Sequence, residues 1–343
     1  MPEELMENRE VQSFRPQARR DFSRVGFALF AMFLVSQLLQ SALGMILNKV
    51  WPTYAEDVPI LYWVVLFAPI YLVALPVCLA ILRKVPTDRE IAAQPPEGQS
   101  LSFLRWLRLL PVALFLMYCG SLIGTAFSLV LSKVIPSIGS SGGAGVNPLL
   151  ELLSGPGLIP RILVVCVIGP FVEEFVFRKQ LIDRTRIYGE ELSVLFSAVM
   201  FGLFHGNLKQ GVYAALLGLL LGYVYLRTRN ILYNFGIHFC VNFLGGVIAP
   251  AAALSGGDID LTDLTEMTEI PASLIAFGAC VVVLFVLGGA LFIALWRKVF
   301  FLPAERELQG KDRHVSWQNP GVILFSLLGI GSIILMFVLG VEF

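Results

Sequence analysis

The amino-acid sequence predicts an all-α integral membrane protein with about nine transmembrane helices. Apolar residues make up 57% of the 343 residues and charged residues only 15%, whereas soluble domains contain about 45–50% and about 25%. The mean hydropathy is +0.77. The apolar residues are also gathered into runs that meet or approach the roughly 20 residues needed to cross a bilayer as a helix.

Nine such runs predict the membrane helices and divide the chain. Two of the runs are short, so we expect the turn at 206–210 between them to be buried or to lie at a cavity. The predicted spans are 25–47, 58–82, 109–131, 158–182, 192–205, 211–226, 231–254, 271–296 and 321–341. The predicted parts of the chain are a cytoplasmic tail at 1–24, helices and loops at 25–157, a helical core at 158–254 and further helices at 255–343.

The positions of lysine and arginine predict the orientation of the chain. Cytoplasmic loops of membrane proteins carry an excess of basic residues. With the N terminus in the cytoplasm, all but four of the 25 basic residues lie in cytoplasmic segments. The four exceptions are Lys49, Lys133, Arg161 and Lys209. We therefore expect a cytoplasmic N terminus and a location in a bacterial plasma membrane. The 25 acidic residues balance the charge and no basic block stands alone, which argues against a nucleic-acid partner.

A few ionisable side chains lie inside the spans, where a charge at the bilayer centre costs about 2.5–3.5 kcal/mol. Glu173 and Glu174 lie in the span at 158–182, and His205 and His238 are two of only three histidines in the chain. Ionisable residues inside membrane helices usually face a cavity and take part in function. This set is therefore the first candidate for a functional site.

The spacing of these residues predicts how they are arranged. Three spans carry pairs of residues four positions apart, which project from one face of a helix. The pairs are Glu174 and Arg178, Phe201 and His205, and His238 and Asn242. Glu174 and Arg178 can form an ion pair along the helix. Glu173 is turned by about 100° from Glu174 and is left to face another partner. We expect the three helix edges to converge on one polar cavity.

One carboxylate, two imidazoles and a carboxamide are suited to hydrolysis of an amide by activated water. Glu173 can take a proton from water as a general base, and His205 can orient that water or bind a metal ion. His238 and Asn242 can donate hydrogen bonds to the oxyanion that forms on the scissile carbonyl group. Glu174 and Arg178 would support them. The set is chemically complete for a peptidase.

The ordered motifs E-E-x-x-x-R, F-x-x-x-H and H-x-x-x-N, on successive predicted helices, resemble the CPBP family of membrane proteases. This family comprises CAAX prenyl endopeptidases and bacteriocin-processing or immunity-type proteins, and is also called the Abi family. The resemblance covers about residues 158–254. It implies an intramembrane endopeptidase in which Glu173 and His205 activate water and His238 and Asn242 form the oxyanion site. A peptide or protein substrate, lipidated in the prenyl endopeptidases, is implied as the partner within the lipid bilayer.

The resemblance leaves the dependence on metal open, because the family is commonly named as metalloproteases while a metal-free scheme has also been argued. If a metal ion such as Zn²⁺ is bound, Glu173, His205 and His238 are the candidate ligands. The chain has no H-E-x-x-H motif, and ligands on three separate helices have no diagnostic spacing.

The sequence alone leaves three other functions open. A transporter or proton relay also uses paired membrane acids with histidine, although we find no repeat relating two halves of the chain. A membrane haem protein with His205 and His238 as axial ligands would leave Glu173 and Glu174 unexplained. A catalytically silent immunity or scaffold protein can keep the same fold and motifs.

Overall fold

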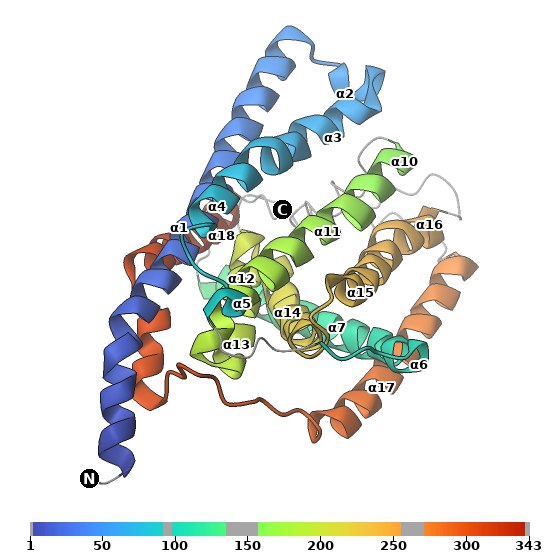
Figure 1. Ribbon diagram of the computed structural model, residues 1–343. Helices are drawn as coiled ribbons and strands as arrows, with labels where there is room; N and C mark the ends of the chain where they lie inside the picture. Colours follow the sequence, from blue (N-terminus) through green and yellow to red (C-terminus); the bar gives the residue numbers. More distant parts are fainter. Residues whose placement is uncertain (1–2, 92–97, 135–156, 255–270, 340–343) are drawn as a thin grey trace.

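The computed structural model describes residues 3–91, 98–134, 157–254 and 271–339, and every regular element in these ranges is helical (Figure 1). The predicted all-α class is confirmed. Each predicted span falls on a helix, apart from the last residues of the span at 321–341, which lie outside the described residues. The predicted parts 25–157 and 255–343 likewise include residues outside these ranges.

The first half of the described chain consists of long helices joined by short ones. The elements are α1 (Glu3–Val50), α2 (Tyr54–Asp57), α3 (Pro59–Ala68), η1 (Pro69–Ala74), α4 (Leu75–Leu82), α5 (Asp88–Ile91), α6 (Phe103–Leu107) and α7 (Leu109–Val134). The segment η1 is π-helical and joins α3 to α4 without a break.

The second half begins with a continuous helix that alternates between α and π geometry. Its elements are α10 (Leu158–Arg161), η2 (Ile162–Ile168), α11 (Gly169–Glu173), η3 (Glu174–Gln180), α12 (Leu181–Thr185) and the short η4 (Arg186–Tyr188). The remaining elements are α13 (Glu190–Phe204), α14 (Leu208–Thr228), α15 (Ile231–Phe243), η5 (Leu244–Ile248), α16 (Ala249–Leu254), α17 (Ala272–Trp296), η7 (Gly310–Ser316) and α18 (Pro320–Leu339).

Fewer helices qualify as membrane spans than the nine predicted. Among the described residues, six helices are long and apolar enough to cross a membrane, or up to seven if the bent pair Gly310–Ser316 and Pro320–Met336 is one span. The predicted span at 158–182 fails because it carries five charged side chains. The predicted span at 192–205 fails because α13 has only 15 residues, of which ten are buried. The chain is an integral membrane protein that encloses these two segments among longer helices.

The helices pack in two groups joined through α14. On one side α1 packs against α18 and against α4, and on the other α7 packs against α17. The helix α14 contacts both α13 and α7, while the helix from α10 to α12 and α15 lie between the two groups in Figure 1. The helices that carry the predicted site residues therefore occupy the middle of the molecule.

The first helix begins well before the predicted first span. Residues 3–24, which we predicted as a cytoplasmic tail, form the start of α1. Ala18 and Phe22 are completely buried, and the Phe22 ring contacts the rings of Tyr188 and Phe196. Around these two residues α1 is a packed element of the protein, because Ala18, Phe22 and Val25 recur on one helical face and are all buried.

Short polar turns position the helices of the site. The Asn207 side chain accepts a hydrogen bond from the Gln210 backbone N–H and caps α14, and the Asn230 side chain does the same for Leu232 in α15. Gly206 has a φ of 62°, a left-handed conformation that closes the turn between α13 and α14. Asn207 is buried and Gln210 lines a cavity, as expected for this turn. Residues 208–210 belong to α14, so the turn itself is shorter than predicted.

The crossing of α1 and α18 depends on two glycines. A Cβ atom on Gly321 would lie 1.8 Å from the Ser23 carbonyl oxygen, and one on Gly26 would lie 2.2 Å from the Val322 backbone nitrogen. Small residues of this kind let membrane helices approach closely. Gly44 and Gly331 lie on the same two helices and have no neighbour within 4 Å of such an atom.

We predict that Gly26→Ala and Gly321→Ala each lower the free energy of unfolding by about 1–3 kcal/mol, because the added methyl group has no room. The matched substitutions Gly44→Ala and Gly331→Ala should be neutral or stabilising by up to about 1 kcal/mol, since alanine favours helix. Thermal unfolding of purified protein in detergent measures both effects. Equal behaviour of the crossing and open positions would contradict this account.

Candidate active site

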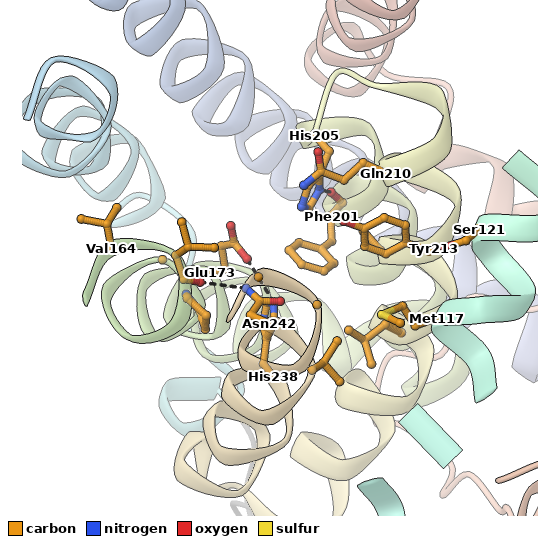
Figure 2. A pocket seen from close by; sticks show the side chains of 18 of the residues that line it. Met117, Ser121, Val164, Glu173, Phe201, His205, Gln210, Tyr213, His238 and Asn242 are labelled. Carbon is orange, nitrogen blue, oxygen red and sulfur yellow. Dashed lines mark hydrogen bonds and ion pairs between the residues drawn. The ribbon is translucent and has the colours of Figure 1, made fainter. Parts of the chain in front are cut away.

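A cavity of about 300 Å³ lies between the two groups of helices. Five of the residues singled out in the sequence line it, namely Glu173, Phe201, His205, His238 and Asn242. Figure 2 shows them on three different helices, with Glu173, His238 and Asn242 on one side and Phe201 and His205 facing them. Two of the three expected helix edges meet at the cavity together with Glu173, whereas the third edge, Glu174 and Arg178, is buried outside the cavity lining. The fold thus brings together residues that are up to 69 positions apart in sequence.

Glu173 and Glu174 are adjacent in sequence but lie in opposite environments. Glu173 ends α11, lines the cavity and keeps 29% of its side chain exposed, whereas Glu174 is completely buried and outside the cavity lining. The π-helical segments η2 and η3 flank this point. Such insertions are frequent at functional sites. Only Glu173 can therefore meet a molecule in the cavity.

The buried Glu174 carboxylate is held by one ion pair and two hydrogen bonds. The Arg178 Nε atom lies 3.1 Å from its Oε2 atom and forms the predicted ion pair. The His238 Nδ1 atom lies 2.9 Å from Oε1, and the Asn234 amide nitrogen lies 3.2 Å from Oε2. A buried charge is tolerated only when it is paired and hydrogen-bonded. These contacts link η3 to α15, so the ion pair also positions His238.

Phe201 packs against three polar members of the site. The Arg178 guanidinium carbon lies 4.4 Å from the centre of the Phe201 ring, and such a cation–π contact is worth about 2 kcal/mol when desolvated. The His205 and His238 rings meet Phe201 nearly at right angles, with ring centres 4.8 Å and 5.9 Å away. Phe201 therefore fixes the relative positions of all three side chains.

The hydrogen bonds of the two histidines determine which ring nitrogen faces the cavity. His205 Nδ1 lies 2.8 Å from the Phe201 carbonyl oxygen, which can only accept, so this nitrogen carries the hydrogen. Glu174 is ionised beside Arg178, so His238 Nδ1 donates to it in the same way. In both neutral rings Nε2 is then an acceptor. His238 Nε2 lies 3.6 Å from Glu173 Oε2, at the cavity.

Asn242 uses one of its two amide hydrogens for structure. Its Nδ2 atom donates to the Val165 carbonyl oxygen on η2, at 2.9 Å. The side chain is anchored by this bond and lines the cavity. The second N–H of the same amide is left for a molecule in the cavity.

The structure adds residues that the sequence analysis did not single out. Asn234 lies one helical turn before His238 and contacts Glu174, so extending the four-residue spacing backwards along α15 would have found it. Gln210 and Tyr213 on α14 line the cavity, as do Met117 and Ser121 on α7. The α7 residues carry no sequence signal, because a methionine or serine in an apolar helix is ordinarily a packing residue.

The candidate metal ligands do not form a compact set. Among the residues that the structure describes, no group of three or more His, Cys, Asp or Glu side chains is arranged to hold a metal ion. Glu173, His205 and His238 share the cavity without converging on one point. Each histidine does present Nε2 with its Nδ1–H held by an acceptor, an arrangement typical of zinc-binding histidines. The set as a whole does not fit a resident Zn²⁺.

Comparison with protein families finds a match to the segment that carries the site. Residues 155–244 match the model described as type II CAAX prenyl endopeptidase Rce1-like. The match contains all six predicted site residues. It supports the CPBP resemblance and a general likeness of the segment to membrane proteases.

A curated relative supports the same assignment. The chain is 31% identical over 85 residues to a Bacillus subtilis (strain 168) protein named "Putative membrane peptidase YdiL". The aligned part is 24% of this chain and spans about a third, 34%, of that protein. No solved structure gives a significant match to the chain.

We predict that Arg178→Met in the Rce1-like segment lowers the free energy of unfolding by about 3–5 kcal/mol, because it leaves the Glu174 charge buried without its cation. The double variant Glu174→Gln/Arg178→Met should recover most of this loss, since it removes both charges. Unfolding of the wild type, both single variants and the double variant in detergent measures the effect. A double variant no more stable than Arg178→Met would show that the ion pair is not the source of the loss.

Proposed function

We propose that the protein is an intramembrane endopeptidase that hydrolyses a peptide bond of a membrane-associated substrate with water activated by Glu173 and His205. One observation carries the proposal: the only cavity-facing carboxylate of the Glu173–Glu174 pair shares its cavity with two histidine Nε2 atoms and an anchored asparagine amide. The match of residues 155–244 to a family model of endopeptidases supports it.

The first step is attack by water on the scissile carbonyl carbon. Glu173 takes a proton from the water as it attacks, and the acceptor atom Nε2 of His205 orients the same water by accepting its second hydrogen. The hydrogen bond from His205 Nδ1 to the Phe201 carbonyl group fixes this ring in the tautomer that the step needs. Proton transfer to a positioned base of this kind contributes about 10²–10⁴-fold to a rate.

The negative charge that develops on the carbonyl oxygen needs donors. Asn242 supplies the amide N–H that its bond to Val165 leaves over. His238 is an acceptor at Nε2 when neutral, so it donates to the oxyanion only after it has taken the water-derived proton from Glu173, whose Oε2 atom lies 3.6 Å away. The Glu174 carboxylate lies 2.9 Å from Nδ1 on the other side of the ring. The same proton then passes from Nε2 to the leaving amine as the C–N bond breaks.

The substrate is proposed from the family and from the membrane setting. The description of the matching family model names CAAX prenyl endopeptidases. A peptide or protein with a lipid anchor is therefore the substrate class to test first. The excess of basic residues on one side of the predicted spans supports a cytoplasmic N terminus, and the location proposed is a bacterial plasma membrane. The proposed mechanism needs no metal ion, since Glu173, His205 and His238 are not arranged to hold one among the residues that the structure describes.

We predict that purified protein in nanodiscs cleaves members of a panel of quenched fluorescent peptides, prenylated and unmodified. Glu173→Gln, His205→Ala and His238→Ala should each lower kcat by about 10²–10⁴-fold, and each variant is first shown to be folded and monodisperse. Equal cleavage by wild type and variants would identify a contaminant and contradict the site. A chelator arm compares activity before and after treatment, and loss restored by Zn²⁺ would contradict the metal-free scheme.

We predict a different kinetic signature for the oxyanion donor. Asn242→Ala should lower kcat by about 10²–10³-fold with a smaller change in KM, because the lost hydrogen bond forms mainly in the transition state. Asn319→Ala is a matched control, since Asn319 is also an asparagine whose amide donates to backbone carbonyl groups but lies outside the cavity lining. An unchanged kcat for a folded Asn242→Ala variant would remove Asn242 from the mechanism.

A further inference from the structure

Asn234 is a completely buried asparagine one helical turn before His238 on α15. Its amide nitrogen donates to two acceptors, the Leu221 carbonyl oxygen on α14 at 2.6 Å and Glu174 Oε2 at 3.2 Å. Both partners only accept, so both amide hydrogens are committed and the orientation of the amide is fixed. The Oδ1 atom of the same side chain is buried without a hydrogen-bond partner. The Asn234 side chain therefore donates a hydrogen bond to Glu174, while its own Oδ1 atom accepts none.

One contact of Glu174 is an ion pair that supplies the opposite charge, and two others are directional hydrogen bonds. Arg178 lies 3.1 Å from Oε2 and supplies the opposite charge, but none of its nitrogens has hydrogen-bond geometry to a partner. The directional bond to Oε2 therefore comes from Asn234, and the bond at Oε1 joins His238. Without Asn234, the carboxylate can turn about its last side-chain bond toward Arg178. Its Oε1 atom would then leave His238 Nδ1.

This contact matters because Glu174 sets the tautomer of His238. Only while Oε1 accepts from Nδ1 does the neutral ring keep Nε2 free to accept at the cavity, 3.6 Å from Glu173. We infer that Asn234 is a positioning residue, which orients the Glu174 carboxylate through the bond that it anchors on α14 and thereby holds His238 in the Nδ1–H tautomer. This inference rests on the proposed peptidase mechanism for its effect on rate, but not for its effect on the imidazole.

The direct test is the protonation of the His238 ring, measured by long-range ¹H–¹⁵N NMR of the full chain with ¹⁵N-labelled histidine in detergent. The chain has three histidines, so His314→Gln and His205→Gln assign the spectrum. In the wild type, neutral His238 should carry its hydrogen on Nδ1. In Asn234→Leu a second population with hydrogen on Nε2 should appear, while the His205 signal stays unchanged.

The control is Asn319→Leu, which removes another completely buried asparagine and should leave the His238 signal as in the wild type. If Asn234→Leu does not fold, Asn234→Ser carries the test, because its shorter side chain cannot bridge Glu174 and Leu221 together. A wild-type His238 protonated on Nε2, or folded Asn234 variants with the Nδ1–H tautomer alone, would overturn the inference.

The kinetic arm separates this inference from the proposed function. With a cleaved peptide, Asn234→Leu should lower kcat by about 10–100-fold, by analogy with the loss when hydrogen-bond partners of metal-ligating histidines are removed, with KM within about threefold of wild type. In a Glu174→Gln background the same substitution should have little further effect, because Asn234 acts through Glu174. Additive losses would overturn the positioning role. A wild type without peptidase activity would count against the proposed function alone, and the NMR result would still decide the role of Asn234.

Discussion

The buried carboxylate of Glu174 is the constraint around which the site is built. A charge without water must be compensated by the protein, and here the compensation comes from Arg178 on the same helix and from His238 and Asn234 on α15. These contacts fix the distance and rotation between the two helices. The neighbouring Glu173 is thereby placed at the cavity, with no structural obligation comparable to that of Glu174.

The functional side chains are held in place by the scaffold and also present polar groups to the cavity. Three of the side chains to which we assign a step have one polar group committed to the scaffold and one facing the cavity: His205 through Phe201, His238 through Glu174, and Asn242 through Val165. Such preorganisation reduces the reorganisation needed during a reaction. The aromatic ring of Phe201 adds a second restraint by contacting both histidines and Arg178 at once.

The membrane setting explains why α13 and the helix from α10 to α12 are poor membrane spans by composition. Several of their polar residues are buried, among them Glu174, Arg178, Ser193 and Ser197, and α14 contacts the helices on both sides of them. Longer apolar helices around such residues can separate them from lipid. Six helices, or up to seven, therefore qualify as spans among the described residues, and the two predicted spans that fail include these buried polar positions.

The sequence by itself determined the all-α membrane class, the ion pair of Glu174 with Arg178, and the set of residues that meet at the cavity. These follow from hydropathy and from the four-residue spacing, which are local properties of a helix. The tertiary structure alone decided that His205 and His238 present Nε2, that Asn242 keeps one N–H free, and that Asn234 supports Glu174. Those features depend on contacts between α11–η3, α13, α14 and α15. Helical periodicity predicts which face a side chain occupies, but which atom of a neighbouring helix it meets depends on how the helices pack.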